Sequence, residues 1–268
     1  MKDFALVLGG GGAKTFSHLG TVDALKEENL KPKLLVTSSM GSLFGYFIAN
    51  EIDTKIIKEK FYSKLNRIRL MRPTRKKGGI VSQNHIKRII DSLCKKRIED
   101  TNIKLIIAAT DIINGKLALL KEGEPKRAIL ASSAFPGIYS PIQTRDGLLV
   151  DSGVLNNVPA DIAKREIGSG KVISINLDGK WDKNIEHYNR STKMVHRAVY
   201  LPIVLRREKI CKKYSDYTIR PYNDTVFSFG SWFEIFSFYR AKKMEEFYQR
   251  GYEYTKDHIE EIKEVLKD

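Results

Sequence analysis

An apolar pentapeptide that runs directly into four consecutive glycines constrains the fold most strongly. Residues Phe4–Leu8 read FALVL, a continuously apolar run typical of a strand buried on both faces of a parallel sheet. The glycines at 9–12 end this strand. Apolar residues then recur at helical spacing, at Phe16, Leu19, Val22 and Leu25. The sequence therefore predicts a strand, a glycine loop and a helix, which together form the first βα unit of an α/β fold.

A second unit follows at once and carries a serine at its turn. Residues 34–38 form another apolar strand, which leads through Ser39 into a second helix. We expect a parallel β-α-β-α start with right-handed crossovers. A serine at a strand–turn–helix junction is typical of a nucleophile elbow, and Gly41 leaves room for the helix to pass close to the strand. Thr37 stands where the usual G-x-S-x-G has its first glycine, and the alternative reading of Ser39 is an ordinary helix N-cap.

The glycine loop fits neither of two common phosphate-binding patterns. A P-loop needs G-x-x-x-x-G-K-[ST]; Lys14 and Thr15 supply its last pair, but leucine and alanine occupy its glycine positions. A dinucleotide fingerprint fails at its last glycine, where Thr15 stands, and no acidic residue ends the second strand. Consecutive glycines before a helix can instead direct N–H groups at a negative charge, as an oxyanion hole requires. The alternative is a tight turn that needs positive φ.

A carboxylate follows an apolar strand in the middle of the chain. Strands are predicted at residues 104–110, 117–120 and 148–150. Asp151 comes directly after the last of these, and a serine hydroxyl attacks an ester only when a base takes its proton. Asp151 is the best-placed candidate for that base. The alternative is a turn former or helix cap.

The remainder of the chain is less informative. Two more strands are predicted at 172–177 and 217–220, and alternating charge over 240–267 predicts a solvent-facing helix. Most of residues 179–216 give no clear prediction. An aromatic cluster precedes the last helix and is either core or the lining of an acyl groove; it contains Trp232, Phe233, Ile235, Phe236, Phe238 and Tyr239.

Composition limits the class of protein. The 268 residues are expected to form one domain, 1–268, and no apolar run approaches the roughly 18 residues that cross a bilayer. The N-terminus reaches glycine before a signal-peptide core could form, and two cysteines, Cys94 and Cys211, stand in no metal-binding pattern. We therefore expect a cytoplasmic protein. The net charge of +15 points to a polyanionic partner, either nucleic acid or an anionic lipid surface.

Much of this charge lies in one segment. Residues 60–90 contain ten Lys or Arg and no Asp or Glu, interleaved with apolar residues. The loop at 72–79 is its most basic part, and we expect Arg72, Arg75, Lys76 and Lys77 to contact anionic headgroups. The alternative is a solvated basic face with no dedicated ligand.

Taken together, these motifs resemble the patatin-like phospholipase family. The glycine loop at 9–14, the Ser39 turn and the Asp151 loop carry the match through their order and spacing. Supporting pieces are His-Leu-Gly at 18–20, the stretch ASSAFPG at 131–137 and Asn-Asn-Val-Pro at 156–159. The resemblance covers most of residues 4–178 and leaves 179–268 without an assigned role.

The resemblance implies a three-layer α/β/α fold with a central, mostly parallel sheet. It implies that Ser39 is the nucleophile, that Asp151 is its proton acceptor and that no metal or cofactor takes part. The oxyanion would be held by N–H groups of Gly10, Gly11 and Gly12. The supporting motif residues are Gly9, Lys14, Gly41 and Gly153. The sequence departs from the family pattern at Thr37, Thr15 and Ser152, but none of these changes removes a group that does chemistry.

No histidine has a sequence context that suggests a catalytic triad. His18 is nearest to the glycine loop, and on the first helix it is expected to pack or hydrogen-bond beneath the site. No H-E-x-x-H or clustered Cys/His pattern suggests a metal hydrolase.

The leading hypothesis is therefore a lipid acyl hydrolase of phospholipase A or lysophospholipase type. It would cleave phospholipid carboxyl esters, with peripheral contact to an anionic membrane and no nucleic-acid partner, and its oligomeric state is open. One alternative is an esterase or acyltransferase acting on soluble acyl groups. Another is a membrane- or nucleic-acid-binding module whose hydrolase site has lapsed.

Overall fold

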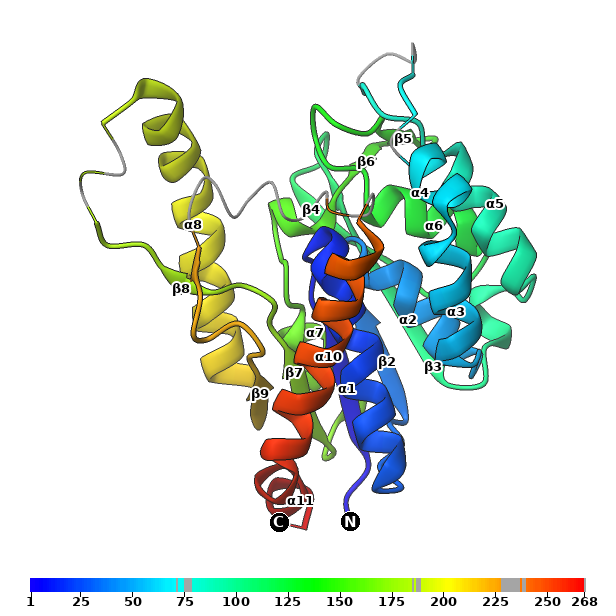
Figure 1. Ribbon diagram of the computed structural model, residues 1–268, viewed down its shortest axis with the longest axis vertical. Helices are drawn as coiled ribbons and strands as arrows, with labels where there is room; N and C mark the ends of the chain where they lie inside the picture. The colour runs from blue at the N-terminus through cyan, green and yellow to red at the C-terminus, as the bar shows by residue number, and fades with distance from the viewer. Residues whose placement is uncertain are drawn as a thin grey trace.

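A central sheet with helices on both faces forms the body of the protein (Figure 1). The computed structural model describes residues 1–70, 72–74, 79–184, 186, 189–227, 237 and 240–267. The strands are β1 (Phe4–Leu8), β2 (Leu34–Thr37), β3 (Lys104–Asp111), β4 (Lys116–Leu120), β5 (Ile142–Gln143), β6 (Leu148–Val150), β7 (Lys171–Ile175), β8 (Lys180–Trp181), β9 (Tyr217–Ile219) and β10 (Val226–Phe227). The α-helices are α1 (Phe16–Glu27), α2 (Gly41–Ala49), α3 (Thr54–Tyr62), α4 (Lys64–Leu70), α5 (Asn84–Leu93), α6 (Pro125–Ser132), α7 (Ala160–Ile167), α8 (Ser191–Tyr214), α10 (Ala241–Asp257) and α11 (Ile259–Lys267). Short 3-10 turns are η1 (Gly12–Thr15), η2 (Ile98–Asp100) and η3 (Ser152–Val154). The predicted three-layer α/β/α fold is confirmed.

The main sheet is mostly parallel, as predicted. Its strand order is β5-β6-β3-β2-β1-β7-β9, with β4 paired to β3. The neighbours β3, β2, β1, β7 and β9 run parallel, whereas β4, β5 and β6 pair antiparallel. In the register, Leu8 at the end of β1 lies beside Thr37 of β2 and Ile175 of β7. The loops that follow these three strands therefore meet at one edge of the sheet.

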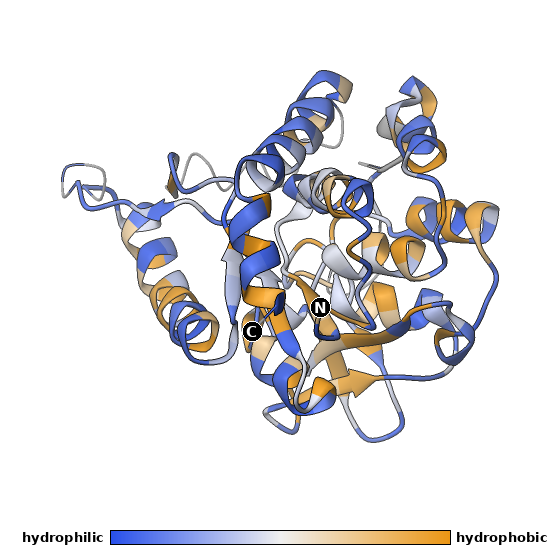
Figure 2. Cartoon of the chain, turned by 90° about the horizontal axis from the view of Figure 1, so that it is seen from below, coloured by the Kyte–Doolittle hydropathy of each residue, from blue (hydrophilic) through white to orange (hydrophobic). Residues whose placement is uncertain are grey.

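Alternate residues of the central strands face different layers, as the two-residue period of a strand requires. Leu6 and Leu8 pack into the larger cluster with helices α1, α2, α3, α5, α6, α10 and α11. Ala5 and Val7 pack into a smaller cluster with α7 and the end of α8. Figure 2 shows hydrophobic residues gathered around the sheet. The side covered by α7 and α8 is the thinner layer.

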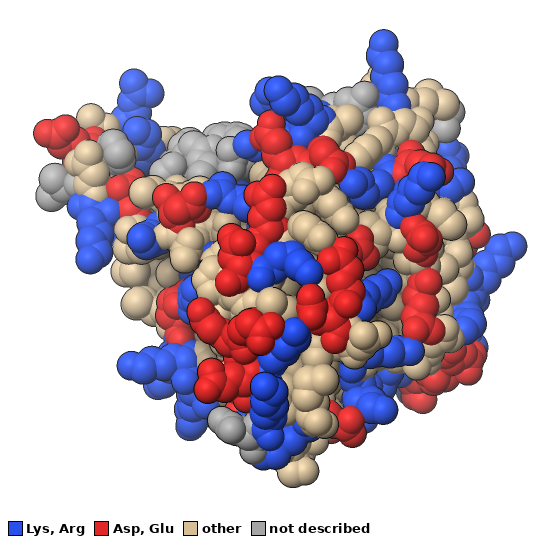
Figure 3. Space-filling model, turned by 60° about the horizontal axis from the view of Figure 1, so that its bottom comes forward, with Lys and Arg blue, Asp and Glu red and all other residues tan. Residues whose placement is uncertain are grey.

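The C-terminal segment is two helices rather than the one solvent-facing helix predicted. Helix α10 lies along α1 (Figure 1) and buries Met244 and Phe247 against it. Contact is so close that a Cβ at Gly20 or at Gly251 would overlap the backbone of the other helix. The outer face of α1, α10 and α11 carries both charges, paired for example between Lys256 and Glu28 (Figure 3). The prediction from charge alternation was wrong because the buried stripe of α10 includes glycine and threonine.

Helix α8, the longest helix in the described part of the chain, was not predicted from the sequence. Its 24 residues include Pro202 in the interior, and it stands at the side of the molecule next to α7 (Figure 1). Only its C-terminal half packs closely, through Ile210 and Cys211. Among the residues described, none of the helices combines the length and the apolar character needed to cross a membrane.

Candidate active site

Ser39 lies in the tight turn between β2 and α2, as the elbow pattern predicted. Its φ is 53°, in the left-handed region that costs a non-glycine residue about 1–3 kcal/mol. A Cβ at Gly41 would lie 2.7 Å from the carbonyl oxygen of Leu8, so the small residue expected there is required by space. This strained turn places the serine at the edge of the sheet where the strand ends meet.

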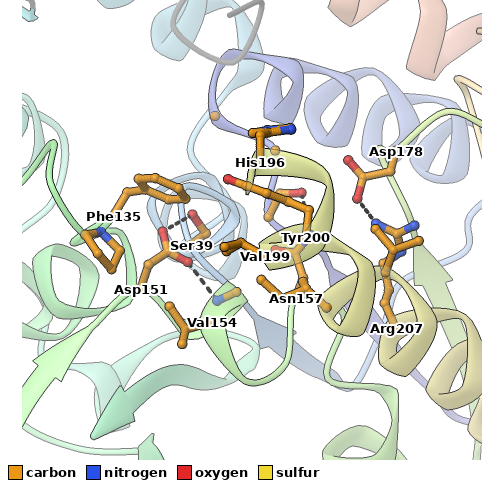
Figure 4. A pocket seen from close by; sticks show the side chains of 17 residues that line it. Ser39, Phe135, Asp151, Val154, Asn157, Asp178, His196, Val199, Tyr200 and Arg207 are labelled. Atoms are coloured by element: carbon orange, nitrogen blue, oxygen red, sulfur yellow. Dashed lines mark hydrogen bonds and ion pairs between the residues drawn. The ribbon is translucent and has the colours of Figure 1, made fainter. Parts of the chain in front are cut away.

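Asp151 directly follows β6 and lies beside Ser39. The Ser39 hydroxyl donates a hydrogen bond of 2.6 Å to Asp151 Oδ2, although the two residues are 112 positions apart (Figure 4). The other carboxylate oxygen accepts from the N–H of Gly153 at 2.7 Å. The N–H of Asp151 itself donates to Ala134 O at 3.0 Å. These contacts fix the orientation of the carboxylate, so a proton on Ser39 Oγ has an acceptor already in line.

Burial changes the acid–base property of this carboxylate. Asp151 is only 3% exposed, and desolvation raises its pKa to about 6. The hydrogen bonds from Ser39 and Gly153 act in the opposite direction because they stabilise the charged form. Asp151 is consequently a stronger base than an ordinary aspartate and is still mostly ionised at neutral pH.

The glycine loop lies against Ser39 and Asp151. Of the three glycines predicted to donate to an oxyanion, Gly10 does not have its N–H available. The N–H of Gly9 donates to Ile175 O at 3.2 Å, and that of Gly10 donates to Asn157 O at 3.0 Å. Gly10 therefore has no free N–H to offer, and its part is to shape the turn. Within the described chain, no hydrogen bond uses the N–H of Gly11 or Gly12, and both residues line the pocket. They are the remaining candidates for oxyanion donors.

His18 supports the loop from below, as the sequence suggested. It is fully buried, and its Nε2 lies 2.7 Å from Gly9 O. Burial lowers the pKa of His18 to about 4, so the ring is neutral at pH 7 and its Nε2–H is the donor. Lys14 is buried too, but its ammonium group lies over the Tyr222 ring, 4.8 Å from the centroid, and outside the pocket lining. The structure does not bring Lys14 to the pair.

A pocket of about 520 Å³ opens above Ser39 and Asp151. One wall is the loop around Phe135 and Pro136, and the floor contains Val154 and Asn157 (Figure 4). The opposite wall comes from α8, which supplies His196, Val199, Tyr200, Ile203, Val204 and Arg207. Its volume is in the range of small-ligand sites, and most of the lining is apolar. The sequence did not predict α8, and it therefore did not predict the residues that form this wall of the pocket.

The family model described as patatin-like phospholipase matches residues 6–164, which include Ser39, Asp151 and the glycine loop. The match covers more than half of the chain. The chain belongs to the patatin-like phospholipase family.

The chain spans only part of the length of the curated relatives that it matches. Patatin-like phospholipase domain-containing protein 6 of Mus musculus is 31% identical over 198 residues, which are 70% of this chain and 14% of that protein. An uncharacterized NTE family protein of Mycobacterium tuberculosis is 31% identical over 178 residues, 65% of this chain and 49% of that protein. The crystal structure of VipD from Legionella pneumophila shares the fold, with a TM-score of 0.51, 14% identity and coverage of 99% of this chain and 66% of that one.

Two of the departures from the patatin-like pattern meet in one buried hydrogen-bond network. Thr37 Oγ1 donates to Ser42 Oγ at 3.0 Å, and Ser42 bonds to Ser132 at 2.7 Å. Ser152 Oγ bonds to Ser38 Oγ at 2.7 Å, and Ser132 lies 3.4 Å from it. All five hydroxyls are inaccessible to solvent. A polar group buried in this way is stable only when it is bonded, so the network fixes the elbow in place of the usual glycines.

The inner end of the pocket contains a buried ion pair. The guanidinium of Arg207, 3% exposed, contacts the carboxylate of Asp178 and bonds Glu208 at 3.1 Å. Burial lowers the pKa of Arg207, while Glu208 opposes that change. Because Arg207 already has carboxylate partners, the pair closes the pocket without presenting an isolated charge.

Half of the basic loop at 72–79, namely residues 75–78, lies outside the described residues. Arg72 is exposed, and its carbonyl accepts from the N–H of Ser82 at 2.8 Å. Arg75, Lys76 and Lys77 fall outside the described residues, as does the predicted aromatic cluster of Trp232, Phe233, Ile235, Phe236, Phe238 and Tyr239. The expected contact of Arg72, Arg75, Lys76 and Lys77 with anionic headgroups stays a prediction. In the ranges described, His, Cys, Asp and Glu form no group of three that could hold a metal ion.

Proposed function

We propose that this protein is a lipid acyl hydrolase that cleaves phospholipid carboxyl esters through an acyl-enzyme on Ser39. One observation carries the proposal: the 2.6 Å hydrogen bond from the Ser39 hydroxyl to Asp151, made at the base of a largely apolar pocket. Membership of the patatin-like family supports lipid hydrolysis in general terms. The dyad, the substrate class and a single domain over 1–268 are our proposals.

In the first half of the reaction, Ser39 Oγ attacks the ester carbonyl carbon while its proton passes to Asp151 Oδ2. Negative charge develops on the carbonyl oxygen, which the N–H groups of Gly11 and Gly12 receive. Loss of one such donor typically costs about 2.7–4 kcal/mol in the transition state. Collapse of this intermediate breaks the ester bond, and the leaving alcohol takes the proton from Asp151.

Water completes the cycle with the same groups. A water molecule attacks the acyl-enzyme carbonyl as Asp151 takes one of its protons, and the oxyanion forms again at Gly11 and Gly12. Breakdown releases the fatty acid and returns the proton to Ser39 Oγ. General-base help of this kind contributes roughly 10²- to 10⁴-fold. The raised pKa of Asp151 favours this role because it brings the base nearer to the working pH.

The pocket favours an acyl chain as the group bound next to Ser39. Its walls at Phe135, Val154 and Val199 are apolar, and the ion pair of Arg207 lies at the far end. An apolar chain lying there would displace water from the ester and strengthen the oxyanion interactions. This supports a lipid rather than a small polar ester as substrate.

The test uses Ser39→Ala and Asp151→Asn with phospholipid vesicles, dispersed short-chain esters and a serine-reactive fluorophosphonate. The wild type should be labelled at Ser39 and should release fatty acid, and both variants should lose hydrolysis by at least about 10³-fold, within the range for a lost nucleophile or base. Asp146→Asn changes an exposed aspartate (side chain 87% exposed) and is the matched control. Absence of both labelling and hydrolysis in the wild type would refute an enzyme. Turnover of dispersed esters alone would favour soluble acyl substrates.

A further inference from the structure

The outer face of α8 is an exposed apolar surface next to the pocket. Met194, Ala198, Leu201 and Leu205 recur at i, i+4, i+7 and i+11, and Val195, Val199 and Pro202 form an adjacent row. Exposed fractions are 53% for Met194, 63% for Val195, 58% for Val199 and 60% for Leu205. Figure 2 shows hydrophobic segments on this helix at the edge of the molecule. A cluster of large exposed apolar side chains on one helix face marks an interaction surface.

Basic residues flank this apolar face at both ends. Arg190 and Lys193 lie at the start of α8, and the exposed side of its C-terminal half carries Arg206, Lys209, Lys212 and Lys213. No Asp or Glu occurs between residues 187 and 207. The single acid of α8, Glu208, is paired with Arg207 and Arg220. An apolar stripe with Lys and Arg around it is the composition of a helix that lies in a membrane interface.

We propose that this face of α8, residues 190–213, docks on the surface of an anionic lipid bilayer and so presents the pocket mouth to lipid. The proposal rests on the function proposed above and identifies the surface through which the substrate is reached. It assigns a role to a helix that lies outside the residues matched by the family model.

Charge argues for a bilayer over a second copy of the chain. Two copies joined through this face would bring the basic ends of both α8 helices together, and each chain has a net charge of +15. An anionic leaflet attracts those same residues. The face of α1, α10 and α11, by comparison, pairs its charges with each other, as in Lys263–Glu28 (Figure 3).

The pocket is continuous with the proposed surface. Val199 belongs to the exposed row and also lines the pocket, one helical turn from His196 and beside Tyr200 (Figure 4). With the outer face of α8 in the headgroup region, an acyl chain could move from the leaflet past Val199 to Ser39 without crossing bulk water. Apolar burial would supply affinity, and the flanking cations would select anionic lipid.

The test compares the wild-type chain with Leu201→Glu/Leu205→Glu, two positions that do not line the pocket. Ile56→Glu, at an exposed apolar position on α3, is the matched control. Co-sedimentation with phosphatidylglycerol/phosphatidylcholine vesicles should show at least about tenfold weaker partitioning for the double variant and no change for the control. Only the double variant removes apolar area that is buried at the lipid interface.

A second pair of substitutions tests the flanking cations. Arg206→Ser/Lys209→Ser should weaken binding to anionic vesicles and leave binding to neutral phosphatidylcholine vesicles unchanged, with Lys55→Ser as the control.

Turnover of a dispersed short-chain ester separates this inference from the proposed function. The double variant should keep wild-type turnover of that ester while losing activity on vesicles. Vesicle binding through α8 without any hydrolysis would leave the docking surface standing and refute the proposed function. Equal vesicle binding by wild type and double variant would overturn the docking surface. So would sedimentation velocity in which the wild type is a dimer and the double variant a monomer, since a second copy would then occupy this face.

Discussion

The backbone N–H of Ser39 donates a hydrogen bond of 2.8 Å to the hydroxyl oxygen of Ser152. Ser39 has a positive φ, so its turn needs support from its neighbours. Ser152 gives that support from the loop that also carries Asp151, because the two residues are adjacent. The hydroxyl at 152 thus ties the proposed nucleophile to the proposed base through a second contact besides their side-chain hydrogen bond.

We predict that Ser152→Ala lowers kcat by about 10- to 100-fold and leaves KM within about threefold. The change leaves the partly buried N–H of Ser39 without its acceptor, which costs about 1–3 kcal/mol. Steady-state kinetics on a dispersed ester and the rate of fluorophosphonate labelling measure the effect. Ser133→Ala is the control, because Ser133 is also buried and its hydroxyl donates to the carbonyl of Ile129 in α6 instead of contacting Ser39. Equal kcat losses in both variants would mean that general destabilisation, rather than positioning of Ser39, is responsible.

The pH dependence of turnover should report Asp151. The carboxylate accepts the proton only when ionised, and burial raises its pKa to about 6. We therefore expect kcat/KM for a neutral ester to fall tenfold per pH unit below about pH 6 and to level off above it. An acid limb near pH 4, the ordinary value for an aspartate, would contradict a buried carboxylate base.

The free energy of unfolding should also depend on Asp151. Its ionised form, which turnover requires, lowers the stability of the fold. The folded pKa of Asp151 is raised from 3.8 to about 6, so folding favours its protonated form and the charged form opposes folding above that range. Asp151→Asn should thus raise the free energy of unfolding at pH 8 by about 1–3 kcal/mol, with the gain shrinking as pH falls from 6 toward 4. Urea titrations of both proteins at pH 4, 6 and 8 measure this difference. A gain that does not change with pH would show that the carboxylate charge is not its source.

The sequence singled out Ser39 and Asp151 as candidates because each follows an apolar strand. Strand β6 runs antiparallel to β3, so Asp151 is brought near Ser39 through the pairing of Val150 with Thr110 rather than through a shared edge of parallel strand ends. The sequence could not identify α8. That helix is apolar on its pocket side, at Ile203 and Val204, and also on its exposed side, so no single-faced helical period appears. Pro202 interrupts the pattern further.

Other parts of the site depend on contacts with no sequence pattern. The hydroxyl network joins Thr37 and Ser42 to Ser132 and Ser152, which lie about a hundred positions away. Likewise, the loss of Gly10 as an oxyanion donor follows from its bond to Asn157, a contact made only in the fold. The sequence predicted two candidate residues that follow apolar strands, whereas the partners of each backbone group required the structure.

The contact between α1 and α10 gives a test of the proposed single domain. We predict that Gly251→Ala lowers the free energy of unfolding by about 1–3 kcal/mol, because the added methyl group would overlap the backbone at Ser17 and force the helices apart. Gln249→Ala, at an exposed position on the same helix, should change it by less than about 0.5 kcal/mol. Urea unfolding should give one transition by both fluorescence and circular dichroism. Two separate transitions, with only one moved by Gly251→Ala, would contradict a single domain.

His196 allows the proposed dyad to be distinguished from a triad. It lines the pocket from α8 and stacks on Tyr200 with ring centroids 4.4 Å apart, whereas the Ser39 hydroxyl donates to Asp151. Partial burial lowers the pKa of His196, which favours the neutral imidazole, the form that accepts a proton. We predict that His196→Ala keeps kcat on a dispersed ester within about fivefold of wild type and leaves the acid limb near pH 6, because Asp151 is the base. His258→Ala, far along the chain at the end of α10, is the control. A loss in kcat beyond about 10³-fold for His196→Ala, with the control unaffected, would assign the proton transfer to the imidazole.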